Sequence, residues 1–150
     1  MDETDAKNGE GGLELATVGQ RLSSFIVDLI VLSVIYIALI ILSGGDMWEA
    51  IVGSGVGEEF QHAHLLMAAI GIGYYTYFFG KGETPGMRLV EIRLVRTDGV
   101  EPVGLRRGFL RWVGMEISGI VLLLGYIWIL FDKKRQGWHD RIAGTYVVRA

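Results

Sequence analysis

Cysteine is absent from this sequence of 150 residues. Disulfide bonds and thiolate metal sites are therefore excluded. The first twenty residues hold five acidic residues, one lysine and no apolar run, so we do not expect a secretory signal peptide there. The sequence also shows no internal repeat and no low-complexity tract, and its length is enough for one domain.

The patterns that most enzymes need are missing as well. The sequence has no glycine-rich phosphate loop, no nucleophile with a paired base and no cluster of metal ligands. His62 and His64 are spaced i, i+2, which points them apart on a helix, so we interpret them as polar residues at a membrane boundary. Only scattered arginines favour nucleic acid. We therefore expect no enzymatic activity, no cofactor, no bound metal and no nucleic-acid partner.

What the sequence does contain is one long apolar stretch, residues 22–42, directly after Arg21. Every residue in it is apolar or small and polar, except Asp28. At about 1.5 Å per residue, a helix of this length spans roughly 30 Å, which matches the hydrocarbon core of a bilayer. A helix in water does not need an apolar surface on all sides, so we interpret the stretch as a membrane span.

The first span begins with a charged residue and contains another within the apolar layer, where an ionised side chain is energetically costly. Arg21, Ser24 and Asp28 share one helix face. An ionised aspartate at mid-depth costs on the order of 3 kcal/mol, so it is normally paired and faces protein or water. Two interpretations stay open. The three residues form a site that binds or relays an ion or proton, or they form a structural ion pair, bridged by Ser24 or water, that fixes the helix to its neighbours.

Two further apolar blocks follow the first. Residues 65–79 predict a second, shorter span that ends in an aromatic belt, and Ala69 and Gly73 offer another helix a close-packing surface. Residues 112–131 form a third block. It contains Glu116, which we interpret as a carboxylate at the interface or as a partner of a nearby arginine.

The charges of the connecting segments predict the topology. Residues 43–61 carry four acidic and no basic residues, whereas residues 80–111 have a net charge of about +3. The positive-inside rule places the basic loop and the N-terminus in the cytoplasm. The basic tail, residues 132–150, lies on the same side only if the third block enters and returns, bending near residues 119–125. A full third span remains the alternative, because the block is long enough for either.

Local patterns in the basic segments predict a small cytoplasmic β element. Residues 81–86, KGETPG, predict a turn, and residues 89–96 alternate as a strand that we expect to pair with residues 145–148. Asp98-Gly99 is a hairpin signal. Residues 104–111 predict an amphipathic helix on the membrane surface.

Several pieces of the chain, taken in order, resemble the RDD family of membrane proteins, which is named for one arginine and two aspartates. The resemblance covers about residues 15–150. The pieces are Arg21 with Asp28, GETPGMRLVEIRLVRTDG, LRRGFLRW and FDKKRQGWHDRIAGTYVV.

This resemblance implies a role for individual residues. The family arginine matches Arg21, its first aspartate matches Asp28, and its second matches Asp140 or Asp132, of which we favour Asp140. Met87 stands where the family typically has a basic residue. The resemblance implies transport, which is the usual proposal for the family, and cation/proton antiport has been suggested for some members.

Together these observations predict an all-α membrane protein with two transmembrane helices, a third spanning or re-entrant helical segment and a small cytoplasmic β element. Residues 1–14 are expected to be a disordered acidic tail, and residues 15–150 a multi-pass domain within the lipid bilayer of the cell membrane. Two functions stay open. One is a small transporter of ions or protons, homo-oligomeric because three segments enclose little pathway. The other is a non-transporting module that binds or stabilises a partner protein or lipid.

The charged residues themselves are expected to form the site. Arg21, Asp28 and Asp140 should gather near the inner membrane boundary, with Arg21 between the two carboxylates. Such a cluster has one excess negative charge, which would attract a cation or hold a proton. Ser24, Asp132 and Glu116 are the further candidates. Residues 132–135, DKKR, have two interpretations, a docking site for anionic lipid headgroups or a plain orientation signal.

Overall fold

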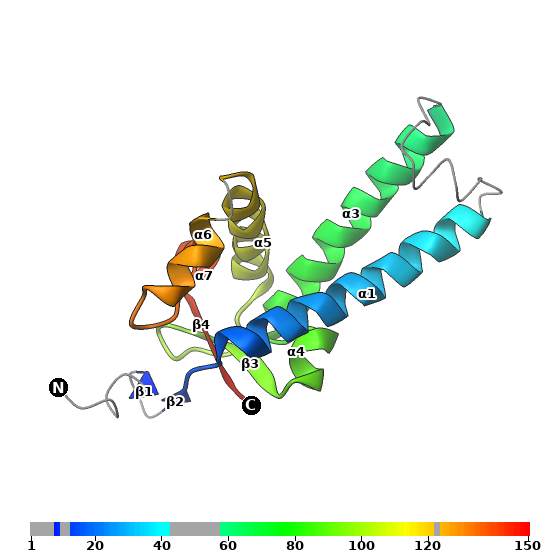
Figure 1. Ribbon diagram of the computed structural model, residues 1–150. Coiled ribbons are helices and arrows are strands. Elements are labelled where there is room, and N and C mark those ends of the chain that lie inside the picture. Colours follow the sequence, from blue (N-terminus) through cyan, green and yellow to red (C-terminus); the bar gives the residue numbers. More distant parts are fainter. Residues whose placement is uncertain (1–7, 10–12, 43–57, 122–123) are drawn as a thin grey trace.

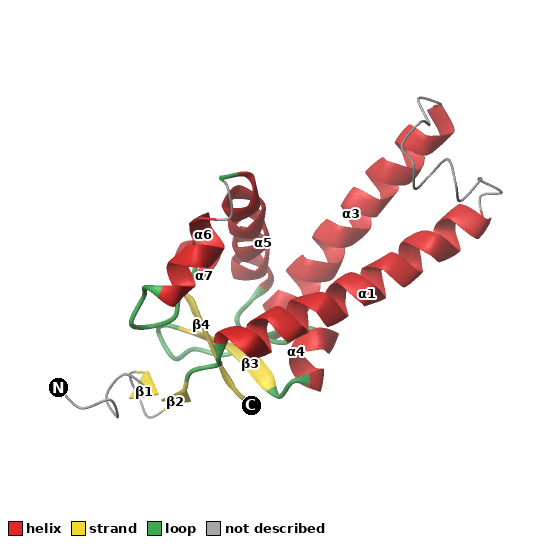
Figure 2. Ribbon diagram, viewed as in Figure 1, coloured by secondary structure: helices red, strands yellow, loops and turns green. Residues whose placement is uncertain are grey.

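The computed structural model describes residues 8–9, 13–42, 58–121 and 124–150. Long helices rise from a base that contains the strands and shorter helices (Figure 1). Helix is the commonest structure in the described chain (Figure 2). The elements in chain order are β1 (Asn8–Gly9), β2 (Leu13–Glu14), α1 (Val18–Leu42), α3 (Glu58–Lys81), α4 (Pro85–Leu89), β3 (Ile92–Arg96), α5 (Leu105–Ile120), α6 (Leu124–Ile127), the 3-10 helix η1 (Trp128–Leu130), α7 (Trp138–Ala143) and β4 (Thr145–Arg149).

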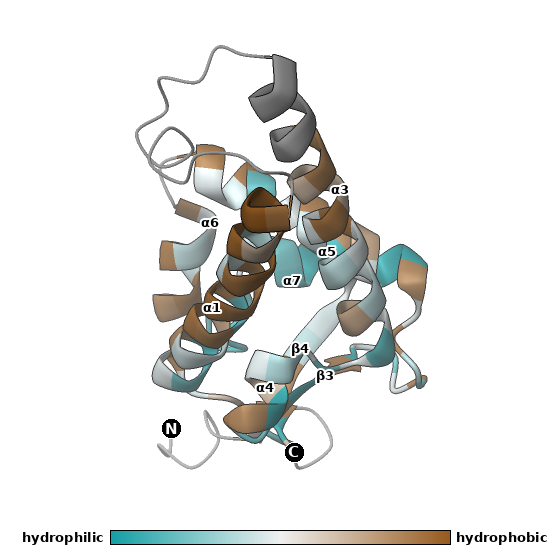
Figure 3. Ribbon diagram, turned by 90° about the vertical axis from the view of Figure 1, so that its right-hand side faces the viewer, coloured by the Kyte–Doolittle hydropathy of each residue, from teal (hydrophilic) through white to brown (hydrophobic). Residues whose placement is uncertain are grey.

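Helix α1 contains the predicted first span, and hydrophobic residues make up most of its length (Figure 3). Leu22, Ile30, Val34 and Ile41 are each more than half exposed. Of the described helices, α1 alone is long and apolar enough to cross a membrane, and a second candidate arises only if α5 and the α6–η1 segment count as one broken span. Because so large an apolar surface is unfavourable in water, its suitable environment is a bilayer.

Helix α3 contains the predicted second apolar block and packs on α5 far more extensively than on α1. A Cβ atom built on Gly108 of α5 would lie 2.5 Å from the carbonyl oxygen of Thr76 and 2.7 Å from the nitrogen of Gly80, so glycine permits the close approach of the two helices. The expected packing surface at Gly73 is different. A Cβ there meets nothing within 4 Å, so no described part of the chain covers it.

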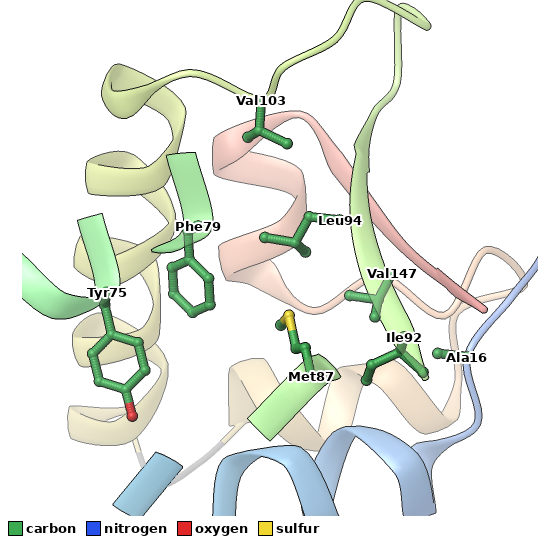
Figure 4. Packing of buried hydrophobic residues seen from close by; sticks show 8 residues of the cluster. All are labelled: Ala16, Tyr75, Phe79, Met87, Ile92, Leu94, Val103 and Val147. Carbon is green, nitrogen blue, oxygen red and sulfur yellow. The ribbon is translucent and has the colours of Figure 1, made fainter. Parts of the chain in front are cut away.

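The predicted pairing of the two basic segments is confirmed. Strands β3 and β4 are antiparallel, with Leu94 opposite Val147, and Leu15 adds a single bridge to Val148. The main apolar core lies beside this sheet, between its strands and the end of α3, and includes a residue of α4 (Figure 4). Its buried members are Ala16, Tyr75, Phe79, Met87, Ile92, Leu94, Val103 and Val147.

Three local predictions in residues 80–111 are only partly correct. The strand begins only at Ile92, because Pro85–Leu89 form the short helix α4. Asp98-Gly99 does lie at a turn, but a helix follows and the partner strand comes from the C-terminal end. Residues 105–111 do form a helix, but this helix continues unbroken to Ile120 as α5, and it buries Arg111.

The third apolar block bends where its glycines predict. Helix α5 ends at Ile120, and its axis makes an angle of 110° with that of the Leu124–Leu130 segment. Most of the predicted acidic tail, residues 43–57 of the acidic loop and the side chains of His62 and His64 lie outside the described residues. Within the tail, Asn8–Gly9 and Leu13–Glu14 pair as two short antiparallel strands.

Candidate functional site

A fully buried carboxylate, that of Asp140, lies at the centre of the charged residues. Asp140 is in the first turn of α7, where its Oδ2 accepts the N–H of Gly137 at 2.9 Å and so caps the helix. Nη1 of Arg21 donates to the same oxygen at 2.7 Å, and Nη1 of Arg111 donates to Oδ1. Two arginines, one from α1 and one from α5, therefore converge on one carboxylate of α7.

Arg111 is the more deeply enclosed of the two arginines. Its Nη1 also donates to the hydroxyl oxygen of Thr145 at 3.1 Å, and its guanidinium carbon lies 5.0 Å from the ring centre of Phe79. A cation over an aromatic face is attracted by the ring, most strongly where water is excluded. Arg111 therefore links α5 to the sheet, to α7 and to the end of α3.

Both arginines have hydrogen-bond donors to spare. Nε and Nη2 of Arg21 and Nε of Arg111 are buried without a partner in the described chain. Two guanidinium groups around one carboxylate leave the cluster with one excess positive charge. The sequence predicts a net negative charge for this cluster, and that prediction is wrong. The net charge is positive because Arg111 joins the cluster, and because Arg21 bonds to Asp140 alone among the described side chains and not to Asp28.

The protonation states at this cluster follow from burial and from the two arginines. Burial, together with the positive charges of Arg111 and Arg21, lowers the pKa of His139 to about 4, although the nearby Asp140 acts in the opposite direction. His139 is therefore neutral at pH 7, with its Nε2 at 3.5 Å from the carboxylate. Burial alone would raise the pKa of Asp140, but Arg111, His139 and Arg21 together hold it well below its usual range. Asp140 is thus a permanent anion.

Asp28 forms a second and separate site on α1. It is buried, its Oδ1 accepts the hydroxyl of Tyr74 at 2.8 Å and the N–H of Gly86 at 2.9 Å, and its Oδ2 accepts the hydroxyl of Thr84 at 2.6 Å. All three partners are neutral, and no cationic side chain of the described residues contacts Asp28. Helices α1, α3 and α4 therefore meet at a carboxylate that lacks a counter-ion.

The sequence around α4 explains how Asp28 is held. Thr84 caps this helix and Pro85 takes its first position, where a missing N–H costs nothing. Gly86 comes next, and a Cβ on it would lie 2.1 Å from the carbonyl oxygen of Ser24 and 2.9 Å from the carboxyl carbon of Asp28. Only glycine allows the backbone to come this close. Thr84 and Gly86 at the start of α4 therefore donate the hydrogen bonds that hold the buried Asp28.

A family model described as the RDD family matches residues 15–144 of the chain. The protein belongs to the RDD family. Two similar proteins are the uncharacterized protein RP437 of Rickettsia prowazekii, 31% identical over 78 residues, and the uncharacterized protein YxaI of Bacillus subtilis, 33% identical over 86 residues. The matches cover 51% and 56% of this chain and 42% and 56% of the relatives, so the chain spans about half the length of each. No solved structure matches it.

The structure of this RDD protein separates the three residues matched to the family's letters. Arg21 and Asp140 form one ion pair, while Asp28 has its own neutral partners about two helical turns further along α1. Asp132 lies apart from Asp140 and pairs with Arg141 at 2.5 Å. This geometry sets Asp140, rather than Asp132, beside the family arginine.

The two remaining candidates take no direct part in either site. The hydroxyl of Ser24 is buried but donates to the backbone oxygen of Arg21 at 2.8 Å, so it does not bridge Arg21 to Asp28. Glu116 is exposed on α5, and Arg107 and Arg111 are both bonded elsewhere. Within the described ranges, no group of three or more His, Asp or Glu side chains is arranged to hold a metal ion.

Sequence reasoning missed three residues of these sites. The arginines and apolar residues around Arg111 predict a surface helix, and the aromatic residues around Tyr74 predict a membrane belt. The glycines and proline around Thr84 predict a turn, although a threonine before Pro-Gly is also typical of a helix cap. A buried aspartate needs hydrogen-bond donors, and this requirement is the signal that could have pointed to the hydroxyls of Tyr74 and Thr84.

Proposed function

We propose that this RDD protein is a small multi-pass membrane transporter that moves an ion or proton, with Asp28 as the exchanging group. One observation carries the proposal. Of the two buried carboxylates among the described residues, Asp140 is neutralised by two arginines, whereas Asp28 has only neutral hydrogen-bond donors. Asp140 therefore carries a fixed charge, whereas the charge of Asp28 can be balanced by a bound proton or cation.

An unbalanced carboxylate in an apolar layer is costly, and binding a proton or a cation removes much of that cost. Tyr74, Thr84 and Gly86 lie on α3 and α4, so they respond to what Asp28 holds. A proton on the carboxylate would weaken its bonds to these donors. Occupancy of Asp28 is thereby coupled to the packing of α1 against α3 and α4, which is what a transport cycle requires.

The proposed topology follows from the sheet. Strand β3 precedes α5 and β4 follows α7, and because they pair, both ends of the intervening segment lie on one side of the membrane. That segment then crosses twice or enters and returns, and its 110° bend favours a re-entrant path. If α3 crosses the membrane as the second span, although it is less apolar than α1, the N-terminus and both basic segments are cytoplasmic. So few segments enclose little pathway, which favours a homo-oligomer.

A second candidate is a non-transporting module that stabilises a partner protein or lipid. The observation that favours it is the number of elements the buried charges connect. Asp28 joins α1, α3 and α4, and Asp140 joins α1, α5 and α7. Such charges would serve only to hold the fold together.

Flux in proteoliposomes separates the two functions. The purified protein is reconstituted, a pH gradient is imposed, and proton and alkali-cation flux are measured for wild type and Asp28→Asn. Glu101→Gln is the matched control, because it removes an acid that is exposed on the cytoplasmic loop. A transporter loses flux in Asp28→Asn while the control retains it and both variants stay folded. Absence of flux in the wild type, with a lower melting temperature in Asp28→Asn, would support the module instead.

A further inference from the structure

A cleft of about 390 Å³ opens beside the start of α1, away from both buried carboxylates. Its apolar part is formed by Val18, Ile129, Leu130 and Phe131, and its basic part by Lys133 and Arg135. We propose that this cleft binds one anionic phospholipid, with the phosphate at the two cations and the acyl chains along the apolar part. This proposal does not depend on transport.

The charge at the cleft favours an anion. Asp132 also lines it, but one of its oxygens pairs with Arg141 at 2.5 Å and the other accepts the N–H of Gln136 at 2.9 Å. Its charge is therefore already balanced. Lys133 is exposed, and Arg135 makes one long bond, from Nη1 to the backbone oxygen of Ala16 at 3.4 Å. Two positive charges thus remain for a ligand.

The apolar part of the cleft favours a lipid over a free anion. Leu130 is 64% exposed and Phe131 78% exposed, just before the DKKR segment that contains the basic residues. Val18 is also exposed, and it begins the apolar surface of α1. Exposed apolar residues adjoining cations at the end of a membrane helix match the two chemistries of a phospholipid, and basic residues at this depth attract anionic headgroups.

Two neighbouring lysines supply a matched pair of variants. Lys133 lines the cleft, whereas Nζ of Lys134 bonds to the hydroxyl of Tyr146 at 3.3 Å and lies 5.8 Å from its ring centre. Lys133→Gln and Lys134→Gln therefore remove the same charge one residue apart. Val18→Trp is a third variant, which fills the apolar part of the cleft and leaves the charge unchanged.

The test is native mass spectrometry of the full chain, purified in detergent with equal amounts of phosphatidylglycerol and phosphatidylcholine. We expect the wild type to retain phosphatidylglycerol selectively. Lys133→Gln should lower its retention about fivefold, the effect of one basic residue near a membrane surface. Lys134→Gln should leave it unchanged, and Val18→Trp should lower it.

Four results would each overturn the proposal. They are equal retention of the two lipids, equal losses in the two lysine variants, undiminished retention in Val18→Trp, and full displacement of phosphatidylglycerol by inorganic phosphate. The last would identify a free-phosphate site. Size-exclusion profiles that match the wild type establish that each variant is folded, which is expected because the three side chains are exposed.

Discussion

At the scale of single residues, the two buried aspartates differ in what surrounds them. Asp140 has two guanidinium partners, and Asp28 has two hydroxyls and a backbone N–H. The sequence analysis predicts that Arg21 lies between the two carboxylates. The structure brings Arg21 to Asp140 alone, and this choice predicts which pairs of mutations interact.

We expect Arg21→Leu and Asp140→Asn to be strongly coupled. Removing one partner of a buried ion pair costs roughly 3–5 kcal/mol, and removing the second partner as well adds less than its own cost. Arg21→Leu and Asp28→Asn should instead add to within about 0.5 kcal/mol, because the two side chains share no bond. Unfolding free energies in detergent for both double-mutant cycles provide the measurement. A large coupling between Arg21 and Asp28 would contradict the structure.

The buried His139 predicts how stability depends on pH. Its pKa is about 4 in the folded protein and about 6.5 when unfolded, so between these values the unfolded chain binds a proton that the folded protein does not. Stability should therefore fall as pH decreases from about 6.5 to about 4, by up to about 3 kcal/mol. Asp140 adds a further loss only below about pH 4, where it becomes protonated in the unfolded chain.

The control for this prediction is His139→Gln, which removes the titrating group and keeps a polar side chain. Melting temperatures between pH 7 and pH 4.5 should change less in this variant than in the wild type. Parallel curves for the two proteins would mean that His139 is not the group responsible.

At the scale of elements, the close contact of α4 with α1 rests on one glycine. A Cβ on Gly86 would lie 2.1 Å from the carbonyl oxygen of Ser24. Gly86→Ala should therefore destabilise the protein by about 1–3 kcal/mol, the cost of overpacking, and weaken the hold on Asp28. Gly73→Ala is the control. Nothing lies within 4 Å of its Cβ, and alanine favours helix by about 1 kcal/mol, so we expect its melting temperature to be unchanged or raised.

The sequence predicted some elements better than others, for physical reasons. Hydrophobic length identified α1, and strand alternation with a valine-rich end identified the β3–β4 pair. The sequence did not reveal α4, because a five-residue helix is too short to show a helical hydrophobic periodicity and its ETPG start is also typical of a turn. Arg111 was misplaced for another reason. Which face of an amphipathic helix is buried depends on a carboxylate, Asp140, that lies far away in the sequence.

At the scale of the whole molecule, the buried charges join two chemically different parts. Arg21 and Asp28 belong to the apolar helix α1, while Asp140 belongs to the short helix that precedes β4 in the basic tail. Helix α1 exposes most of its surface and makes its most extensive contact with α4, so polar bonds within its first three turns fix it to the base. The exposed apolar side chains of α1, from Val18 to Leu42, form the surface that is suited to contact lipid.

The β3–β4 sheet requires the segments before and after the third apolar block to lie on the same side of the membrane. Thr145 is buried, so labelling positions are better taken at Val100, which is 51% exposed, and at the exposed Ala150. Single cysteines at these positions of the cysteine-free chain should react with an impermeant thiol reagent only after permeabilisation. Ser54→Cys, in the acidic loop predicted outside, should react in intact cells.

Labelling of Ala150→Cys but not Val100→Cys in intact cells would require a third full span and the loss of the sheet. Labelling of both would keep the sheet and reverse the orientation.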